Sequence, residues 1–431
     1  MGNGRVAVIG GGAAGMLAAA VAAENGAAVT LFEKNEKLGR KLGITGKGRC
    51  NVTNHCDVQT VLANIPRNPR FLQSALYTFS PADTMALMER LGVELKTERG
   101  NRVFPVSDRA SEIVHALRTY LTQTGVVVKH APVQALRFAG QAESPRRICG
   151  LYAMGKAYDF DAVIVATGGV SYPLTGSTGD GYRFAASAGH TVISPAPSLV
   201  PLETKDAFCR QLTGLSLKNT GLRLYDMQCG GALVYEDFGE LMFTHFGLTG
   251  PMILSASAHC TKRPLDRYEI SLDLKPALDA QKLDERLLRD FAQNCNRNFE
   301  HALDALLPKR LIAVVIAKSG IAKETKVHDI TRVQRQALLQ QLKDFRISVK
   351  GFRPIAEAII TAGGVCVKEV TPKTMESKCC RGLFFAGEVL DVDAYTGGFN
   401  LQIAFSTAYA AGRGAAQACA EATAQKEEEV L

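Results

Sequence analysis

The hydrophobic positions near the start of the chain follow a strand, helix and strand pattern. Apolar runs at 5–9 and 28–32 predict two buried strands, and the alanine-rich run at 13–23 predicts a helix between them. A unit of about 30 residues in this order is typical of two parallel strands joined by a crossover helix. Similar segments follow, with helices predicted at 67–92 and 111–122 and strands at 93–96, 103–104, 126–129, 133–138 and 161–166. We therefore expect an α/β fold with a parallel sheet.

The middle of the chain has a different pattern. From 194 to 275, short apolar runs between glycine and proline turns predict many short strands, and from 276 to 346 the apolar spacing predicts helices. After 352 the α/β pattern returns, with a helix expected to run to about Gly412. We predict one domain formed by 1–193 and 353–431, interrupted by an inserted domain at 194–352 with a β-rich and a helical part.

Composition narrows the class of protein. Of the 431 residues, 46% are hydrophobic and 21% charged, which is typical of a globular chain of two or three domains. No apolar run approaches the roughly 18 residues of a membrane span, and the start lacks a secretory pattern. Eleven scattered cysteines without a Cys-x-x-Cys pair argue against a zinc ribbon or a redox dithiol, and no metal site is indicated. A reducing cytoplasm fits these features best.

The charge balance leaves one class of partner open. The net charge of +8 permits a polyanion such as RNA. The basic residues are spread along the chain rather than gathered in a run, which favours an ordinary basic enzyme with a small-molecule substrate. The sequence does not indicate the oligomeric state.

The strongest motif follows the first predicted strand. Gly10, Gly12 and Gly15 form G-x-G-x-x-G, which allows a tight turn, a close backbone approach to a pyrophosphate and close helix packing. The amino end of the helix offers free N–H groups and partial positive charge to the phosphates. Glu33, at the end of the second strand, is placed to accept hydrogen bonds from ribose hydroxyls. The unit therefore predicts a dinucleotide site.

A second segment, at 39–54, is rich in glycine, cations and asparagine. Its glycines suggest backbone that runs close to a ligand, and Arg40, Lys41, Lys47 and Arg49 could balance phosphate charge. Asn51 and Asn54 could bond the edge of a flavin. Cys50 is a candidate thiol, but without a partner cysteine nearby in sequence a packing role is favoured.

Two further segments end buried strands. The run at 163–169 ends in Ala-Thr-Gly-Gly and leads into a glycine-rich loop at 176–181, which is expected to form part of the site wall. The run at 382–391 is followed by Gly397-Gly398, which opens a helix whose amino end can face a flavin ring and stabilise its reduced, anionic form.

The residues that we predict to bind the cofactor come from these four segments and their neighbours. They are Gly10, Gly12, Ala13, Ala14, Gly15, Glu33, Lys34, Gly39, Arg40, Lys41, Thr45, Gly46, Gly48, Arg49, Cys50, Asn51, Val133, Ala166, Thr167, Gly168, Gly169, Asp180, Gly387, Glu388, Asp391, Gly398, Asn400, Leu401 and Gln402.

These motifs resemble the BaiN/YhiN-type family of bacterial FAD-dependent oxidoreductases, also described as NAD(P)/FAD-dependent oxidoreductases or aminoacetone oxidase family FAD-binding enzymes. The matching stretches span the chain, at 10–15, 39–54, 166–181, 244–251, 362–365 and 374–402. The resemblance implies a Rossmann-type FAD-binding domain interrupted by a β-barrel-like part and a helical part. It leaves the substrate open among conjugated enones, small amino ketones and uridine in ribosomal RNA.

The chain has no second complete G-x-G-x-x-G unit, so a separate NAD domain with a redox disulfide is not expected. We expect NADH or NADPH to reach the flavin transiently, and hydride to pass through flavin N5 to an electron-poor C=C bond. A proton must also be delivered, and the candidate donors are His245, Tyr172 and Tyr395. The alternatives are an oxidase of a small amine or amino ketone and a flavin-dependent RNA uridine reductase.

Overall fold

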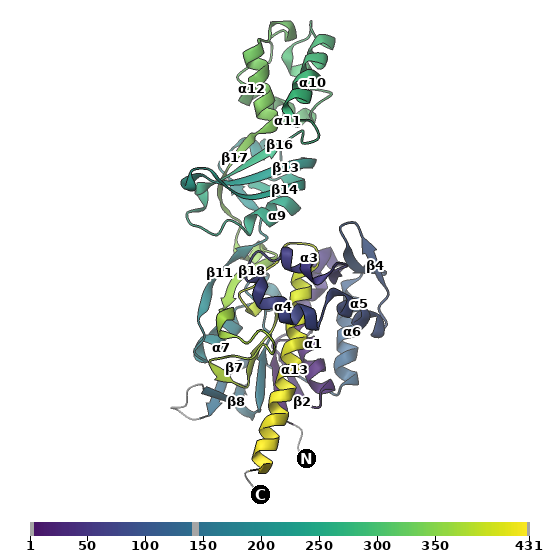
Figure 1. Ribbon diagram of the computed structural model, residues 1–431, viewed down its shortest axis with the longest axis vertical. Coiled ribbons are helices and arrows are strands. Elements are labelled where there is room, and N and C mark those ends of the chain that lie inside the picture. Colours follow the sequence, from purple (N-terminus) through teal and green to yellow (C-terminus); the bar gives the residue numbers. More distant parts are fainter. Residues whose placement is uncertain (1–3, 140–145, 429–431) are drawn as a thin grey trace. The chain divides into compact units, whose positions relative to one another are not determined.

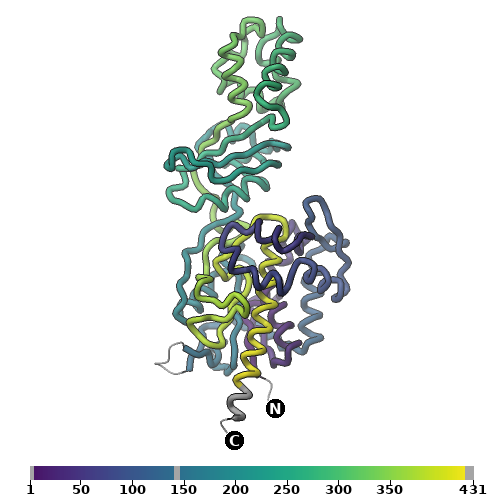
Figure 2. The backbone as a smooth tube through the Cα atoms, in the orientation of Figure 1, coloured from purple at the N-terminus to yellow at the C-terminus, as the bar shows by residue number. Residues whose placement is uncertain are grey.

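The computed structural model describes residues 4–139 and 146–428 (Figure 1). The chain divides into two compact units, one formed by Met1–Ser198 with Ile355–Leu431 and the other by Leu199–Pro354. Each unit has its own hydrophobic core. In Figure 2 the first unit contains chain from both ends of the colour scale, so its fold is completed by segments far apart in sequence.

The first unit is built on a five-stranded sheet of order β20-β10-β1-β2-β6. Every neighbouring pair in this sheet is parallel. Its strands are β1 (Arg5–Ile9), β2 (Ala28–Glu33), β6 (Val127–His130), β10 (Ala162–Val165) and β20 (Leu383–Phe385). Ile9 pairs with Val165, which pairs with Phe385, so the carboxyl ends of three strands align at one edge. This confirms the predicted Rossmann-type parallel sheet.

Smaller sheets and the helices complete the first unit. The second sheet contains β7 (Val133–Ala139), β8 (Arg146–Ala153), β9 (Lys156–Asp159) and β19 (Cys380–Arg381). A third sheet contains β11 (Val192–Ser198) and β18 (Ile360–Val365). A fourth contains β3 (Thr53–Asn54), β4 (Leu95–Glu98) and β5 (Arg102–Pro105). The helices are α1 (Ala13–Glu24), α2 (Arg40–Ile44), α3 (Val58–Ala63), α4 (Pro69–Thr78), α5 (Pro81–Arg90), α6 (Ala110–Gln123), α7 (Asp180–Ser187) and α13 (Phe399–Glu428).

The last helix, α13, continues past the point where we predicted its end. Gly412 lies inside it, and a Cβ added there would be 2.6 Å from the Ala18 carbonyl oxygen of α1. α13 and α1 pack along one another, as Figure 1 also shows. The glycine therefore serves close helix packing rather than a helix end, a distinction that the residue type alone does not make.

The single helix predicted at 67–92 is two helices, α4 and α5. Ser80 caps α5: its hydroxyl accepts the Asp83 N–H at 3.3 Å, and the Asp83 carboxylate accepts the Ser80 N–H at 2.7 Å. Pro81 at the first helical position strengthens this start. The capping box was present in the sequence, and it outweighs the continuous helical spacing.

The second unit contains a closed barrel of order β12-β15-β14-β13-β16-β17. Its strands are β12 (Leu202–Thr204), β13 (Ser216–Asp226), β14 (Ala232–Phe243), β15 (Gly247–Thr249), β16 (Tyr268–Asp273) and β17 (Phe345–Phe352), and its helices are α8 (Phe208–Gln211), α9 (Pro251–Ser257), α10 (Ala280–Gln293), α11 (Lys309–Ser319) and α12 (Arg332–Lys343). β13 and β14 are long paired strands, not the short ones predicted, because their pairing continues through Phe238 and Gly239, with two register shifts along its length.

Two segments cross the boundaries expected from the sequence pattern. β17 follows the helices and pairs with both β16 and β12, so the barrel closes only after the helical part. β11 pairs with β18, which keeps Val192–Ser198 in the first unit. None of the helices in 4–139 and 146–428 combines the length and apolarity that a bilayer crossing requires.

Candidate functional site

A cavity of about 670 Å³ lies in the first unit and includes the carboxyl ends of β1, β2 and β10. Its volume is typical of a small-molecule site, and its place is where open α/β sheets bind their ligands. The lining residues are Ile9, Gly10, Gly11, Gly12, Ala13, Ala14, Phe32, Glu33, Lys34, Asn35, Lys37, Gly39, Arg40, Lys41, Leu42, Thr45, Ala131, Pro132, Val133, Gln134, Ala166, Thr167, Gly168, Thr175, Gly176, Ser177, Thr178, Asp180, Arg183, Phe184, Ile359, Ile360, Ala386, Glu388, Asn400, Leu401 and Ala404.

The glycines of the first motif have different surroundings. A Cβ at Gly15 would lie 1.7 Å from the Gly10 carbonyl oxygen, and a Cβ at Gly10 would lie 2.6 Å from the Ala166 carbonyl oxygen. A Cβ at Gly12 would meet no protein atom within 4 Å, although Gly12 lines the cavity. Packing therefore explains Gly10 and Gly15, whereas glycine at position 12 leaves room for a ligand.

The amino end of α1 opens onto this space. Its N-cap, Gly12, makes no side-chain cap, and the first turn contains no acidic residue. The first N–H groups of a helix have no partner within the helix, so these groups at Ala13 and Ala14 are free to bind an anion. The terminus is suited to a phosphate group.

Glu33 is fixed at the end of β2. Its Oε2 accepts the Gly11 N–H at 2.7 Å, and its Oε1 accepts the backbone N–H of Asn35 at 2.8 Å and the side-chain amide at 2.6 Å. The side chain lines the cavity but is largely buried. A carboxylate accepts about four hydrogen bonds, so Glu33 keeps capacity for a ribose hydroxyl.

An ion pair from two distant segments forms another part of the wall. Lys41 Nζ lies 2.6 Å from Glu388 Oε2 and donates to Ser171 Oγ at 2.7 Å. The Ser171 hydroxyl donates to Glu388 Oε1 at 3.0 Å, and the Thr361 N–H donates to the same oxygen at 2.9 Å. The side chains of Lys41 and Glu388 are 23% and 13% exposed, so the pair is only partly screened by water.

A second pair lies where β2 ends and α7 begins. Lys34 Nζ donates to Asp180 Oδ2 at 2.7 Å and to Thr178 Oγ1 at 2.6 Å. Burial alone would raise the pKa of Asp180. The hydrogen bonds from Lys34 and Thr178 and the nearby cations have a larger, opposite effect, so the pKa of Asp180 lies below its usual value. Asp180 is therefore ionised and orders the glycine-rich loop.

The charges of the lining suit a dinucleotide. Five cations line the cavity (Lys34, Lys37, Arg40, Lys41 and Arg183) against three carboxylates (Glu33, Asp180 and Glu388). This excess of two positive charges, with the uncapped α1, matches the two negative charges of a diphosphate. The size and charge of the cavity are therefore suited to a dinucleotide such as FAD.

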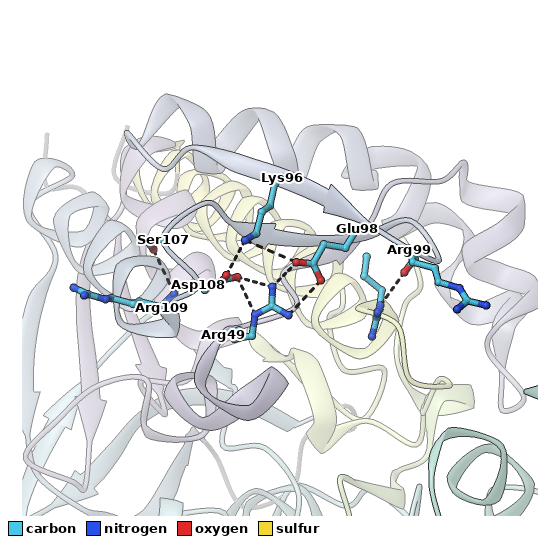
Figure 3. Close-up of polar contacts among 8 residues, drawn as sticks. Arg49, Lys96, Glu98, Arg99, Ser107, Asp108 and Arg109 are labelled. Carbon is cyan, nitrogen blue, oxygen red and sulfur yellow. Dashed lines mark hydrogen bonds and ion pairs between the residues drawn. The ribbon is translucent and has the colours of Figure 1, made fainter. Parts of the chain in front are cut away.

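Arg49, which we predicted at the cofactor, is engaged elsewhere (Figure 3). Its guanidinium pairs with Glu98 and donates to Asp108 Oδ1 from Nε at 2.8 Å. It also lies 4.2 Å from the ring centroid of Phe104. Lys96 contacts the same two carboxylates. Arg49 does not line the cavity, so the lining does not support its predicted contact with the cofactor, and an Arg49 variant is needed to test that contact.

Other predicted cofactor residues also lie outside the lining. They are Gly15, Gly46, Gly48, Cys50, Asn51, Gly169, Gly387, Asp391, Gly398 and Gln402. Gln402 is fully buried, and its Oε1 accepts the hydroxyls of Thr53 at 2.6 Å and Thr84 at 2.8 Å. Burial raises the pKa of Cys50 to about 12, and burial also raises the pKa of Asp391. Gln402 and Cys50 are thus engaged in internal hydrogen bonds and packing, whereas Asn51 Oδ1 and Asp391 Oδ1 are buried without a hydrogen-bond partner among the described residues.

The three candidate proton donors lie in different places. Lys41 Nζ is 5.9 Å from the ring centroid of Tyr172, next to the cavity wall. The Tyr395 carbonyl accepts the side-chain amide of Asn400, a lining residue, at 3.3 Å. His245 belongs to the second unit, where it is exposed between β14 and β15.

Several lining residues were not identified from the sequence. Ala131, Pro132 and Gln134 follow β6, the neighbour of β2, and the rule that ligands bind beyond the carboxyl ends of strands would have found them. Ile359 and Ile360 lie at the start of β18, and nothing in their local sequence marks a ligand wall.

Known proteins resemble this chain over nearly its whole length. Residues 4–414 match the family model described as HI0933-like protein Rossmann domain. The 3-dehydro-bile acid delta(4,6)-reductase of Clostridium scindens is 30% identical, covering 96% of this chain and 99% of the relative. The ribosomal RNA dihydrouridine synthases of Haemophilus influenzae and Escherichia coli are 32% and 30% identical, each covering 94% of this chain and 96% of the relative.

Proposed function

The chain belongs to the HI0933-like Rossmann-domain family of FAD-dependent oxidoreductases, and we propose that it reduces an electron-poor C=C bond of a small organic substrate, with NADH or NADPH as electron donor. The reaction would add a hydride to one carbon and a proton to the other. The full-length likeness to a delta(4,6)-reductase supports this reaction class over others available to flavoproteins.

The chemistry of the cavity lining is the observation that carries the proposal. Within the described part of the chain, the lining includes no cysteine and no histidine. The lining side chains thus offer charge, hydrogen bonds and shape, but no thiol to exchange electrons. Bound FAD would supply the hydride transfer, as is usual where a protein contributes orientation and electrostatics.

The chain's own residues would bind, orient and protonate. The amino end of α1 would hold the diphosphate, and Glu33 the ribose. Lys41, fixed by Glu388 and Ser171, would place a positive charge on the wall near Tyr172. Tyr172 and Tyr395 are the proton-donor candidates in the unit that contains the cavity, and His245 is the candidate in the barrel unit.

Anaerobic reduction of the purified FAD-loaded protein tests the proposal. NADH or NADPH should bleach the flavin absorbance, and a conjugated enone should restore it while losing its own double bond. Reoxidation by oxygen with peroxide release, and none by enones, would instead support an amine or amino ketone oxidase. If neither nicotinamide bleaches the flavin, the proposed donors are wrong.

The proton donor can be identified with conservative variants. Tyr172→Phe, Tyr395→Phe and His245→Gln should each be compared for hydride transfer from NAD(P)H and for enone reduction. Loss of the donor should slow the second step by about 10²–10⁴-fold and leave the first unchanged. A variant that slows both steps equally does not remove the proton donor.

A second substrate class has its own support. Two relatives are ribosomal RNA dihydrouridine synthases, and saturation of uridine is the reduction of a C=C bond conjugated to a carbonyl. The net charge of +8 is compatible with an RNA partner. Uridine-containing ribosomal RNA should then reoxidise the reduced protein, and its binding should weaken steeply with salt. Reoxidation by enones alone would exclude this substrate.

A further inference from the structure

A group of metal-ligating side chains lies outside the cofactor cavity. One ligand atom from each of His190, Glu369 and Cys379 lies within 4.8 Å of the other two. His190 stands between α7 and β11, and Cys379 directly precedes β19. Glu369 ends a short 3₁₀ turn after β18. The cluster therefore joins three segments that are separate in sequence, and none of its members lines the cavity.

The imidazole of His190 is buried and held in one orientation. Its side chain is 0% exposed, and its ring packs edge-on against Phe385 with 4.9 Å between centroids. Nε2 lies 2.6 Å from the Ser377 hydroxyl. Nδ1 lies 3.3 Å from Glu369 Oε2 but has no hydrogen-bond partner in the part of the chain that the structure describes. A buried polar atom without a partner calls for an explanation, and a bound ion is one that fits the neighbouring ligand atoms.

The other two members are also fixed by neighbouring groups. Thr191 holds the Glu369 carboxylate, with its N–H donating to Oε2 and its hydroxyl to Oε1, both at 2.8 Å. The Cys379 N–H donates to Ser377 Oγ at 3.0 Å. Ser377 therefore contacts both the imidazole and the backbone of the cysteine, and it is the kind of outer partner that orients a metal-bound histidine.

We propose that His190 Nδ1, the Glu369 carboxylate and the Cys379 thiolate bind one Zn²⁺ ion, with water as the fourth ligand. Nitrogen, oxygen and thiolate sulfur together are the ligands that zinc prefers among the common divalent cations. Binding forms the Zn–S bond and breaks the S–H bond of Cys379, whose proton passes to solvent. Because zinc–ligand bonds are about 2.0–2.3 Å, the ligand atoms of a tetrahedral site lie about 3.3–3.8 Å apart. The 3.3 Å between His190 Nδ1 and Glu369 Oε2 already matches this spacing, and all three ligand atoms lie within 4.8 Å of one another.

The expected role of the zinc is to stabilise this part of the fold. The cluster lies against Phe385 of β20, one of the strands of the parallel sheet. A ligand that binds only the folded protein raises its stability by mass action. Sequence spacing did not indicate the site, because its ligands come from distant segments and not from a short Cys or His motif.

Zinc titration of the full-length FAD-loaded protein tests the proposal. A chromophoric chelator that competes for zinc should report one tight site per chain, and X-ray absorption should show one sulfur ligand. Cys379→Ser should weaken binding at least tenfold and remove the sulfur signal. Cys295→Ser removes an exposed thiol of the other unit and should change neither, which makes it the matched control.

Folding must be followed separately from zinc binding. The flavin absorbance and the melting temperature without zinc should be the same in Cys379→Ser and in the wild type, and zinc should raise the melting temperature of the wild type only. Glu369→Gln gives a second variant for which weaker zinc binding is expected. Equal zinc affinity of the wild type and both variants, or no bound zinc in a folded yellow wild type, would overturn the proposal.

Discussion

Two glycine-rich segments of the first unit, 10–15 and 39–54, look alike in sequence but differ in the structure. In the first, all positions from Gly10 to Ala14 line the cavity. In the second, the lining includes Lys41 and ends at Thr45, and the chain then turns away. The first segment is placed by local geometry, because a strand, a tight turn and a helix follow one another directly. The second depends on partners from elsewhere in the chain.

Lys41 and Arg49 show what decides the outcome in the second segment. Lys41 pairs with Glu388, which follows β20 at the edge of the parallel sheet. Arg49 pairs with Glu98 and Asp108, which lie near a small antiparallel sheet. Both are cations in a polar loop, so residue type predicts a phosphate contact for each. The carboxylate that each side chain reaches depends on the fold.

The largest effect in this comparison is expected for Gly12→Val. The backbone of Gly12 has φ −80° and ψ −170°, which valine tolerates, and a Cβ added there meets no described protein atom within 4 Å. The isopropyl group would occupy the space at the amino end of α1, so affinity for FAD should fall at least about a hundredfold, or about 2.7 kcal/mol. Fluorescence titration of the FAD-free protein measures this.

Gly43→Val is the matched control for Gly12→Val. A Cβ at Gly43 would also meet no atom within 4 Å, but Gly43 does not line the cavity. Its FAD affinity should stay at the wild-type value. If both valine variants retain FAD equally well, the diphosphate does not bind at the amino end of α1.

A smaller effect is expected for Lys41→Met. The change leaves the mostly buried Glu388 carboxylate without its cation, which should lower the free energy of unfolding by roughly 1–3 kcal/mol. FAD affinity should fall about tenfold, because one positive charge leaves the wall. Urea denaturation and FAD titration measure the two effects. The double variant Lys41→Met, Glu388→Gln should recover the free energy of unfolding but not the affinity for FAD. If the free energy of unfolding does not recover, the Lys41 and Glu388 side chains are not energetically coupled.

Arg49→Met should affect stability but not the cofactor. Its partners Glu98 and Asp108 are exposed enough to be solvated when the arginine is lost. We expect a small fall in melting temperature that shrinks at high salt, and an FAD affinity within about twofold of the wild type. Thermal unfolding at low and high ionic strength and FAD titration test this. A tenfold loss of FAD affinity would show that Arg49, like Lys41, contributes to cofactor binding.

The smallest effect is expected at Cys50. Because burial raises its pKa to about 12, the thiol should stay protonated and resist alkylation at pH 7–9 while exposed Cys295 reacts. Cys50→Ala should keep FAD binding and the rate of flavin reduction. Peptide mass spectrometry after alkylation measures the first outcome. Rapid modification of Cys50 in the folded protein would contradict the packing role.

The parts of the fold that could be predicted are those set by local sequence. The strand, turn and helix around Gly10 and the acidic residue Glu33 follow from hydrophobic runs and one glycine motif. The division of the chain was expected because the hydrophobic pattern changes in the middle. The capping box at Ser80 is equally local, and it indicates a helix start that the helical spacing alone does not.

The parts that could not be predicted depend on contacts between distant segments. Nothing near Gly412 distinguishes a helix end from a helix contact; only the proximity of Ala18 does. β17 closes the barrel across a helical stretch, and pairing over such a distance leaves no mark in the local pattern. In the candidate site, the place of Ile359 in the cavity wall and the pairing of Arg49 with Asp108 likewise depend on segments that are distant in sequence.

The packing of α13 on α1 has a consequence for how the protein is made. A ribosome releases Gly10–Gly15 early, but β20 and α13 emerge only after the whole barrel unit has been synthesised. Leu199–Pro354 has its own core, so we expect it to fold before the other unit, whose α1 packs on α13. Nascent chains stalled before 399 should therefore fail to capture the coenzyme, because they lack α13.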